Sequence, residues 1–160
     1  MRSDLKLYAR AAGLGVIAGL RSMTAPALVS RGSAIKGLFN GNASEQPKWG
    51  TRTAAMFLGA LAVGEMVFDK MPMAPNRTMP GSVLFRAASG ALVGATLFAA
   101  NREDRTRGAI AGAIGAVAAT YGAYYLRKEL GEKWHVPDPV LGLVEDAIAV
   151  GSGLGVLQSS

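Results

Sequence analysis

Residues 108–126 read GAIAGAIGAVAATYGAYYL, and this stretch decides the fold of the chain. It contains no charged residue, and as an α-helix rising ~1.5 Å per residue it would be nearly 30 Å long. That length matches the hydrocarbon core of a bilayer. The alternating pattern of a β-strand is absent. The stretch therefore predicts a membrane-spanning helix.

Four further apolar segments surround this stretch, and charged regions separate them. Apolar residues cover every side of these segments rather than a single stripe, which is typical of helices in lipid. We therefore predict an all-α fold, a polytopic membrane bundle that forms one domain over residues 1–160. Its five short helices, rich in glycine and alanine, are expected at 7–29, 53–68, 83–100, 108–126 and 139–157. A soluble helical domain is the alternative.

The composition agrees with a membrane protein and excludes several other classes. Half of the 160 residues are apolar and 18% are charged, against about 25% in soluble proteins. This excludes intrinsic disorder. The chain has no cysteine and a single histidine, His135, which excludes disulfide scaffolds, thiolate zinc sites and histidine-based triads. We expect no metal site and no cofactor.

The net charge of +6 comes from 17 Lys and Arg against 11 Asp and Glu. These cations separate apolar segments instead of gathering on one face, so we expect a lipid bilayer and no nucleic acid as partner. Slightly more Lys and Arg fall on the side of the N-terminus, which favours a cytoplasmic N-terminus. A cleaved signal peptide is the alternative for the first segment, but Arg21 interrupts its apolar run.

Proline and glycine mark expected helix ends. Pro26 lacks a donor and is expected to kink or end the first helix. The glycine-dense segment 151–155 is expected to fray or break the last one. A turn at 80–82 should lead into the third helix, Asp138 should cap the fifth, and Trp134 should lie in the loop before it.

Two sequence matches indicate an internal repeat. Residues 10–12 and 86–88 both read RAA near a helix start, which would relate the first two helices to the third and fourth as parallel hairpins. The competing match sets 15–18 against 115–118 and would be an inverted relation. Both matches lie among small residues, which let helices approach closely in lipid.

Charges within the apolar segments give the strongest functional indication. A charge at the centre of a bilayer costs roughly 2.5–3.5 kcal/mol, so such groups should pair. Counting ~1.5 Å per residue places Arg10, Arg86 and the carboxylates at similar depths on one side. Arg21 should lie about 20 Å from that side, beyond this layer, unless the first helix is broken; Ser22 and Thr24 beside it make it a candidate anion or substrate contact. The candidate pathway or network residues are Arg21, Glu65, Asp69, Arg86, Glu145 and Asp146.

Three interpretations of this layer remain open. It is an ion or substrate path, a structural ion-pair network, or a set of charges that reach the membrane surface. Burial favours the protonated form of an unpaired carboxyl group, so Glu65 and Glu145 are candidates for proton exchange. Hard cations such as Mg²⁺ or Na⁺ prefer the same oxygens, but the spacing specifies none of them.

The segment 69–80 contains three prolines and two cations. Proline fixes φ and removes backbone donors, so the segment should be extended. It is a gate over the charged layer or a rigid connector. The candidate gate residues are Pro72, Pro75, Arg77 and Pro80.

Several motifs of the chain occur together in a known family. They are Gly19-Leu20-Arg21-Ser22 with Pro26, Gly64-Glu65 with Asp69-Lys70, the prolines and Arg77 of the segment 69–80, Arg86 with Gly90 and Gly94, and Glu145-Asp146-Ala147. Through these motifs the chain resembles, over nearly its whole length, a family of small bacterial integral membrane proteins catalogued as domain of unknown function 4126. The resemblance implies a polytopic protein of the bacterial inner membrane without an assigned activity.

We expect a transporter- or channel-like bundle with a buried layer of paired charges. The alternative is a non-catalytic structural or accessory subunit of a larger membrane complex, and association with itself or with other membrane subunits is open. A membrane enzyme is the third hypothesis, since carboxylate pairs serve acid–base chemistry. The chain shows no nucleophile–base pair, phosphate loop or metal-ligand spacing, so we do not expect an enzyme.

Overall fold

The computed structural model describes residues 2–34, 52–68, 78–134 and 138–158. All regular structure in these ranges is α-helical, which confirms the all-α prediction. The helices are α1 (Arg2–Leu20), α2 (Thr24–Ala34), α3 (Arg52–Phe68), α4 (Pro80–Ala100), α5 (Arg105–Trp134) and α6 (Asp138–Gln158).

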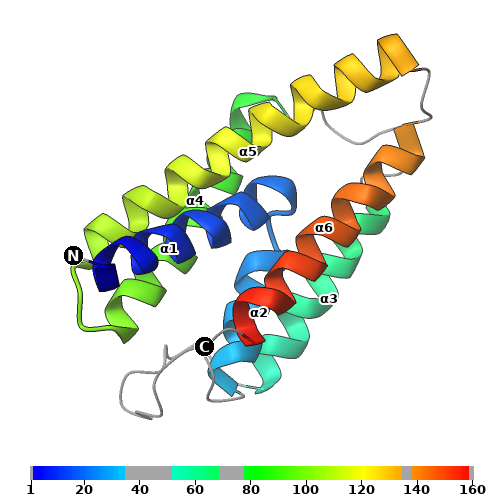
Figure 1. Cartoon of the computed structure of the whole chain (residues 1–160). Coiled ribbons are helices and arrows are strands. Elements are labelled where there is room, and N and C mark those ends of the chain that lie inside the picture. The colour runs from blue at the N-terminus through cyan, green and yellow to red at the C-terminus, as the bar shows by residue number, and fades with distance from the viewer. Residues whose placement is uncertain (1, 35–51, 69–77, 135–137, 159–160) are drawn as a thin grey trace.

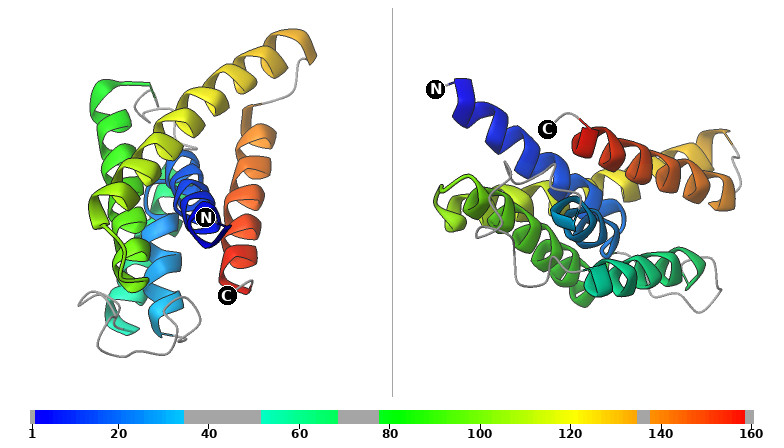
Figure 2. Two further views of the ribbon diagram at one scale, coloured as in Figure 1. Left: turned by 60° about the vertical axis from the view of Figure 1, so that its left-hand side comes forward. Right: turned by 90° about the horizontal axis from the view of Figure 1, so that it is seen from below.

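The helices form two groups that meet where α1 and α2 join. Helices α1, α4 and α5 pack against one another, while α2 packs with α3 on the other side (Figure 1). Helix α6 runs beside α1 and α2 (Figure 2). The chain therefore crosses from one group to the other between residues 20 and 24.

Among the residues that the structure describes, two helices are long and apolar enough to cross a membrane. They are α4, Pro80–Ala100, and the Arg105–Lys133 part of α5. These correspond to the expected helices at 83–100 and 108–126. The other three expected spans stay a prediction, and with them the five-span bundle.

Helix α5 is longer than expected. It begins at Arg105 and ends at Trp134 instead of covering 108–126. Trp134 is therefore the last residue of a helix and not part of a loop. The segment after Leu126 consists mostly of good helix formers, and Glu129 Oε2 lies 2.5 Å from Lys133 Nζ one turn later. At ~1.5 Å per residue α5 is about 45 Å long, more than a hydrocarbon core is thick.

Two helices extend over residues that were expected to lie in a turn or at a break. Helix α4 begins directly at Pro80, with Met79 as its N-cap, so Pro80 belongs to a helix and not to the preceding loop. Proline suits the first turn of a helix, because its φ is preset and its missing N–H has no partner there anyway. Helix α6 continues through 151–155 to Gln158, so the expected break in the last helix is wrong.

Glycines hold α1, α4 and α5 at backbone contact. A Cβ atom added at Gly15 or Gly90 would overlap the carbonyl oxygen of Gly112, and one at Gly94 would overlap that of Gly108. Such close approach is the usual basis of helix association in lipid. Helix α5 therefore packs closely against both α1 and α4 through its small residues.

The segments behind the expected inverted repeat lie against each other. Gly15 meets Gly112, and Gly115 meets the carbonyl group of Ala12. The two helices run in the same direction, since Gly19 also meets the carbonyl group of Ala116, so they are not related as the inverted repeat predicts. Helices α1 and α4 run in opposite directions, because Tyr8 packs on Phe98 while Arg86 binds Gly19 O, so the parallel-hairpin relation is wrong as well.

Candidate functional site

The break in the first helix is placed by Pro26. Helix α1 ends at Leu20 and α2 begins at Thr24, leaving residues 21–23 between them. In one continuous helix the Pro26 ring would clash with the carbonyl group of Ser22 and offer it no N–H. Restarting the helix at Thr24 places Pro26 in the first turn, where proline is tolerated. The expected break of the first helix is therefore confirmed.

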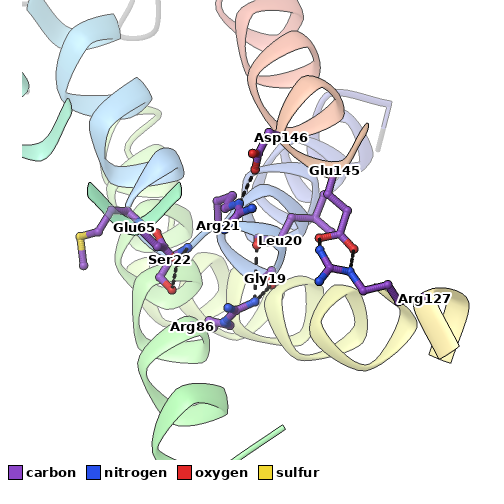
Figure 3. A network of polar contacts seen from close by, with 10 residues as sticks. Gly19, Leu20, Arg21, Ser22, Glu65, Arg86, Arg127, Glu145 and Asp146 are labelled. Carbon is purple, nitrogen blue, oxygen red and sulfur yellow. Dashed lines mark hydrogen bonds and ion pairs between the residues drawn. The ribbon is translucent and has the colours of Figure 1, made fainter. Parts of the chain in front are cut away.

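Glu65 of α3 binds the N-terminal end of α2 (Figure 3). Its Oε1 accepts hydrogen bonds from Ser22 N at 2.9 Å and Ser22 Oγ at 2.8 Å. Its Oε2 accepts one from Met23 N at 2.9 Å. These backbone donors would otherwise lack partners, and the positive end of the helix dipole favours a carboxylate there.

Arg86 of α4 binds the opposite end of the break, where α1 stops. Its Nη1 donates to Gly19 O at 2.6 Å, and the side chain is only 3% exposed. Thr120 Oγ1 of α5 lies 3.2 Å from the same oxygen and 2.8 Å from Ala116 O, so its single proton is shared between two acceptors. A guanidinium at the C-terminal end of a helix is favoured by the dipole and satisfies carbonyl groups that have no partner in the helix.

A further hydrogen bond from α4 also holds the break. Ser89 Oγ of α4 donates to Ser22 O at 2.5 Å. Ser22 is thus held from both sides, by Glu65 through its donors and by Ser89 through its carbonyl group. Ser89 and Thr120 could not be identified from the sequence, because single hydroxyl groups on a helix face form no pattern of their own.

Arg21 lies in the break, between α1 and α2, and forms an ion pair with Asp146 of α6. Its Nε lies 2.5 Å from Asp146 Oδ1, and Arg21 is 1% exposed. The depth count for an unbroken helix placed Arg21 about 20 Å from the edge of the bundle, beyond the charged layer. Because the helix is broken, its side chain lies in that layer.

Arg127 of α5 pairs with Glu145 of α6 through two hydrogen bonds. Nε and Nη2 of Arg127 lie 3.1 Å and 2.8 Å from the two carboxylate oxygens. This fork geometry is among the strongest of charge-assisted pairs. From the sequence alone, Arg127 directly follows the expected helix 108–126, where a cation is typical of the membrane interface. Because α5 continues past Leu126, Arg127 lies within this helix and contacts α6. The position at which α5 ends, which the sequence did not show, therefore decides the partner of Arg127.

The remaining expected residues fall elsewhere. Asp69, Pro72, Pro75 and Arg77 lie outside the described residues. Arg10 was expected level with Arg86, but it lies about 13 Å along α1 from Gly19, which Arg86 contacts. Those two arginines are therefore at different depths, and that part of the expected layer is wrong.

The network that results is balanced in charge. It combines three guanidinium groups with three carboxylates: Arg21, Arg86 and Arg127 with Glu65, Glu145 and Asp146. Within the described ranges no group of three or more His, Cys, Asp or Glu side chains could hold a metal ion. The break between α1 and α2 is the element to which helices α3 to α6 all contribute a polar side chain.

Comparison with protein-family models, curated proteins and solved structures finds no match to this chain. The resemblance to domain of unknown function 4126 therefore stays a prediction.

Proposed function

We propose that this chain is a multi-pass membrane protein that carries a small charged solute, with the break between α1 and α2 as its binding site. Placement in a bacterial inner membrane belongs to the same proposal. The observation that carries it is a helix interrupted inside the bundle, with charged side chains from three other helices and a threonine hydroxyl from a fourth around the interruption.

The distribution of side chains supports solvation by lipid. Large apolar residues are more than half exposed on each outer helix, for example Phe57, Leu84, Ile114 and Leu143. Several polar and charged residues are buried instead, among them Arg21, Arg86 and Thr120. An exterior of this kind marks contact with lipid or other membrane helices, and buried charges that pair with one another are typical of membrane interiors.

The broken helix supports a transport function. Irregular backbone in a membrane is tolerated where it is buried in protein or lines a cavity. In many transporters two half-helices meet near the middle of the membrane, and their free ends contact the solute. The ends of α1 and α2 have this arrangement, with donors at one end and acceptors at the other.

A liposome flux assay tests the proposal. Purified protein is reconstituted, and efflux of radiolabelled sodium, chloride and lactate is compared with that from protein-free vesicles. Glu65→Gln and Glu145→Gln should each reduce flux about tenfold or more, because a charge-assisted hydrogen bond contributes about 1.5–3 kcal/mol. The matched control is Glu129→Gln, at an exposed position of α5. Full activity of both network variants, or no flux of any probe, contradicts transport.

The charge balance supports a second candidate, a structural or accessory subunit. Each carboxylate of the network already binds donors of the chain, as a network that only sets helix positions would require. Purification in a mild detergent would then recover partner proteins in fixed stoichiometry. A homogeneous preparation of this chain alone, active in the flux assay, contradicts the accessory role.

A further inference from the structure

The N-terminus of α2 is already occupied by a carboxylate, and that carboxylate comes from another helix. Both oxygens of Glu65 are used, one by the two donors of Ser22 and the other by Met23 N. Glu65 itself is half-buried and belongs to α3, which packs mainly on α2 at the edge of the bundle. Figure 3 shows its side chain reaching across to the break.

Thr24 provides a further donor that Glu65 does not use. The residue is 4% exposed, and its buried Oγ1 has no hydrogen-bond partner among the residues that the structure describes. Thr24 is the first residue of α2, and the Cα–Cβ bond of a helical residue tilts toward the helix N-terminus. This tilt directs the Thr24 side chain toward the end of α2 that Glu65 occupies. A buried hydroxyl without a partner is costly, and a ligand at this end would satisfy it.

We propose that the N-terminus of α2 binds a small carboxylate anion, and that Glu65 occupies this site as a tethered substitute. The donors are Ser22 N, Ser22 Oγ and Met23 N, with Thr24 Oγ1 as the fourth. This inference rests on the proposed function and gives its solute a chemical class. When a carboxylate anion from solution displaces the Glu65 side chain from this site, one negative charge replaces another, and the net charge at the break stays the same.

The charge balance of the break favours a single negative charge in this position. Arg21 is paired with Asp146, Arg86 lies on the carbonyl groups of α1, and Arg127 is paired with Glu145. Without Glu65 the described groups around the break would hold one positive charge in excess, beside the positive end of α2. A monovalent anion restores neutrality, whereas a cation would add to the excess.

Removing the tethered carboxylate tests the site directly. Glu65→Ala is purified in detergent without added lipid, and its unfolding temperature is measured against sodium acetate, with sodium chloride keeping the ionic strength constant. Acetate should raise it saturably, by about 3 °C or more once the site is filled. The wild type should show no such rise, because Glu65 already fills the site. Acetamide, which has acetate's shape without its charge, should have no effect on the variant.

Asp104 provides a matched control. It also binds a helix N-terminus, since its Oδ1 accepts a hydrogen bond from Thr106 N at 2.8 Å, but it is exposed to solvent at the start of α5. Asp104→Ala should show no saturable response to acetate. An equal response in both variants would mean that acetate acts on helix ends in general and would overturn the proposal.

Two further variants keep the test decisive if Glu65→Ala does not fold. Glu65→Gln retains the side-chain volume but places an amide donor or a neutral oxygen at the site, so acetate should still stabilise it saturably. Adding Thr24→Val to either variant should weaken acetate binding by about 2- to 10-fold, the effect of one neutral hydrogen bond. No response in either folded Glu65 variant overturns the proposal, while flux through the wild-type protein would leave transport intact.

Discussion

The crossing of α1, α4 and α5 and the break between α1 and α2 are held together by opposite means. At the crossing, glycines bring backbone against backbone, and Gly112 meets both Gly15 and Gly90. At the break, arginine, carboxylate and hydroxyl groups bind the free ends of two helices. The crossing is possible because its residues have small side chains or none, whereas the break is held by hydrogen bonds from side chains.

This difference has one physical cause, if lipid surrounds the molecule. Lipid tails solvate apolar side chains as well as another helix does, so helices associate through close contact instead of hydrophobic burial. The same solvent offers no hydrogen bonds, so each backbone group freed by the break needs a partner from within the protein. Steric changes should therefore damage the crossing, and loss of charge should damage the break.

The largest effect is expected from Gly112→Val. The added side chain would overlap the carbonyl oxygen of Gly90 and approach Gly94, so α4 and α5 would have to separate. We expect a loss of about 4 kcal/mol or more in the free energy of unfolding, or failure to fold. Unfolding in mixed micelles with increasing denaturing detergent measures it.

Gly122→Val is the control for this prediction, because a Cβ atom at Gly122 would meet nothing within 4 Å. It lies on the same helix and should change stability by less than about 1 kcal/mol. Equal losses at Gly112 and Gly122 would show that close backbone contact does not stabilise the crossing.

An intermediate effect is expected from Arg86→Ala. It removes the donor to Gly19 O and leaves that carbonyl group inside the protein with only a share of the Thr120 hydroxyl proton. We expect a loss of about 3 kcal/mol in the free energy of unfolding. Arg107→Ala, at an exposed site on α5, should change it by less than about 0.5 kcal/mol. Similar values for the two arginines would contradict the proposed role of charge at the break.

The smallest effect is expected for the coupling between Arg127 and Glu145. Arg127→Met and Glu145→Gln each leave one partner behind, so the double variant should lose less stability than the two single losses combined. We expect a coupling of about 1–2 kcal/mol in a double-mutant cycle. Additive losses would mean that the two side chains do not act as a pair and would remove Arg127 from the network.

Most residues of the charged site could be predicted from their type and from their approximate depth along the expected helices. Glu65, Arg86, Glu145 and Asp146 were expected to come together because lipid penalises isolated charges, and the structure places them around one break. Which of these side chains contact each other could not be predicted from the sequence. Arg127 was assigned to the membrane surface, since the end of α5 could not be read from a gradual change from apolar to charged residues.

Composition and local pattern were sufficient for the helical class, for the two described helices apolar enough to span a membrane and, through Pro26, for the interruption of the first helix. These features depend on neighbours along the chain. Which end of the break receives Glu65 and which receives Arg86 depends on residues 43 to 67 positions away. Only the tertiary structure decides this, since the partners of a free helix end are chosen by how separate helices pack and not by the residues beside it.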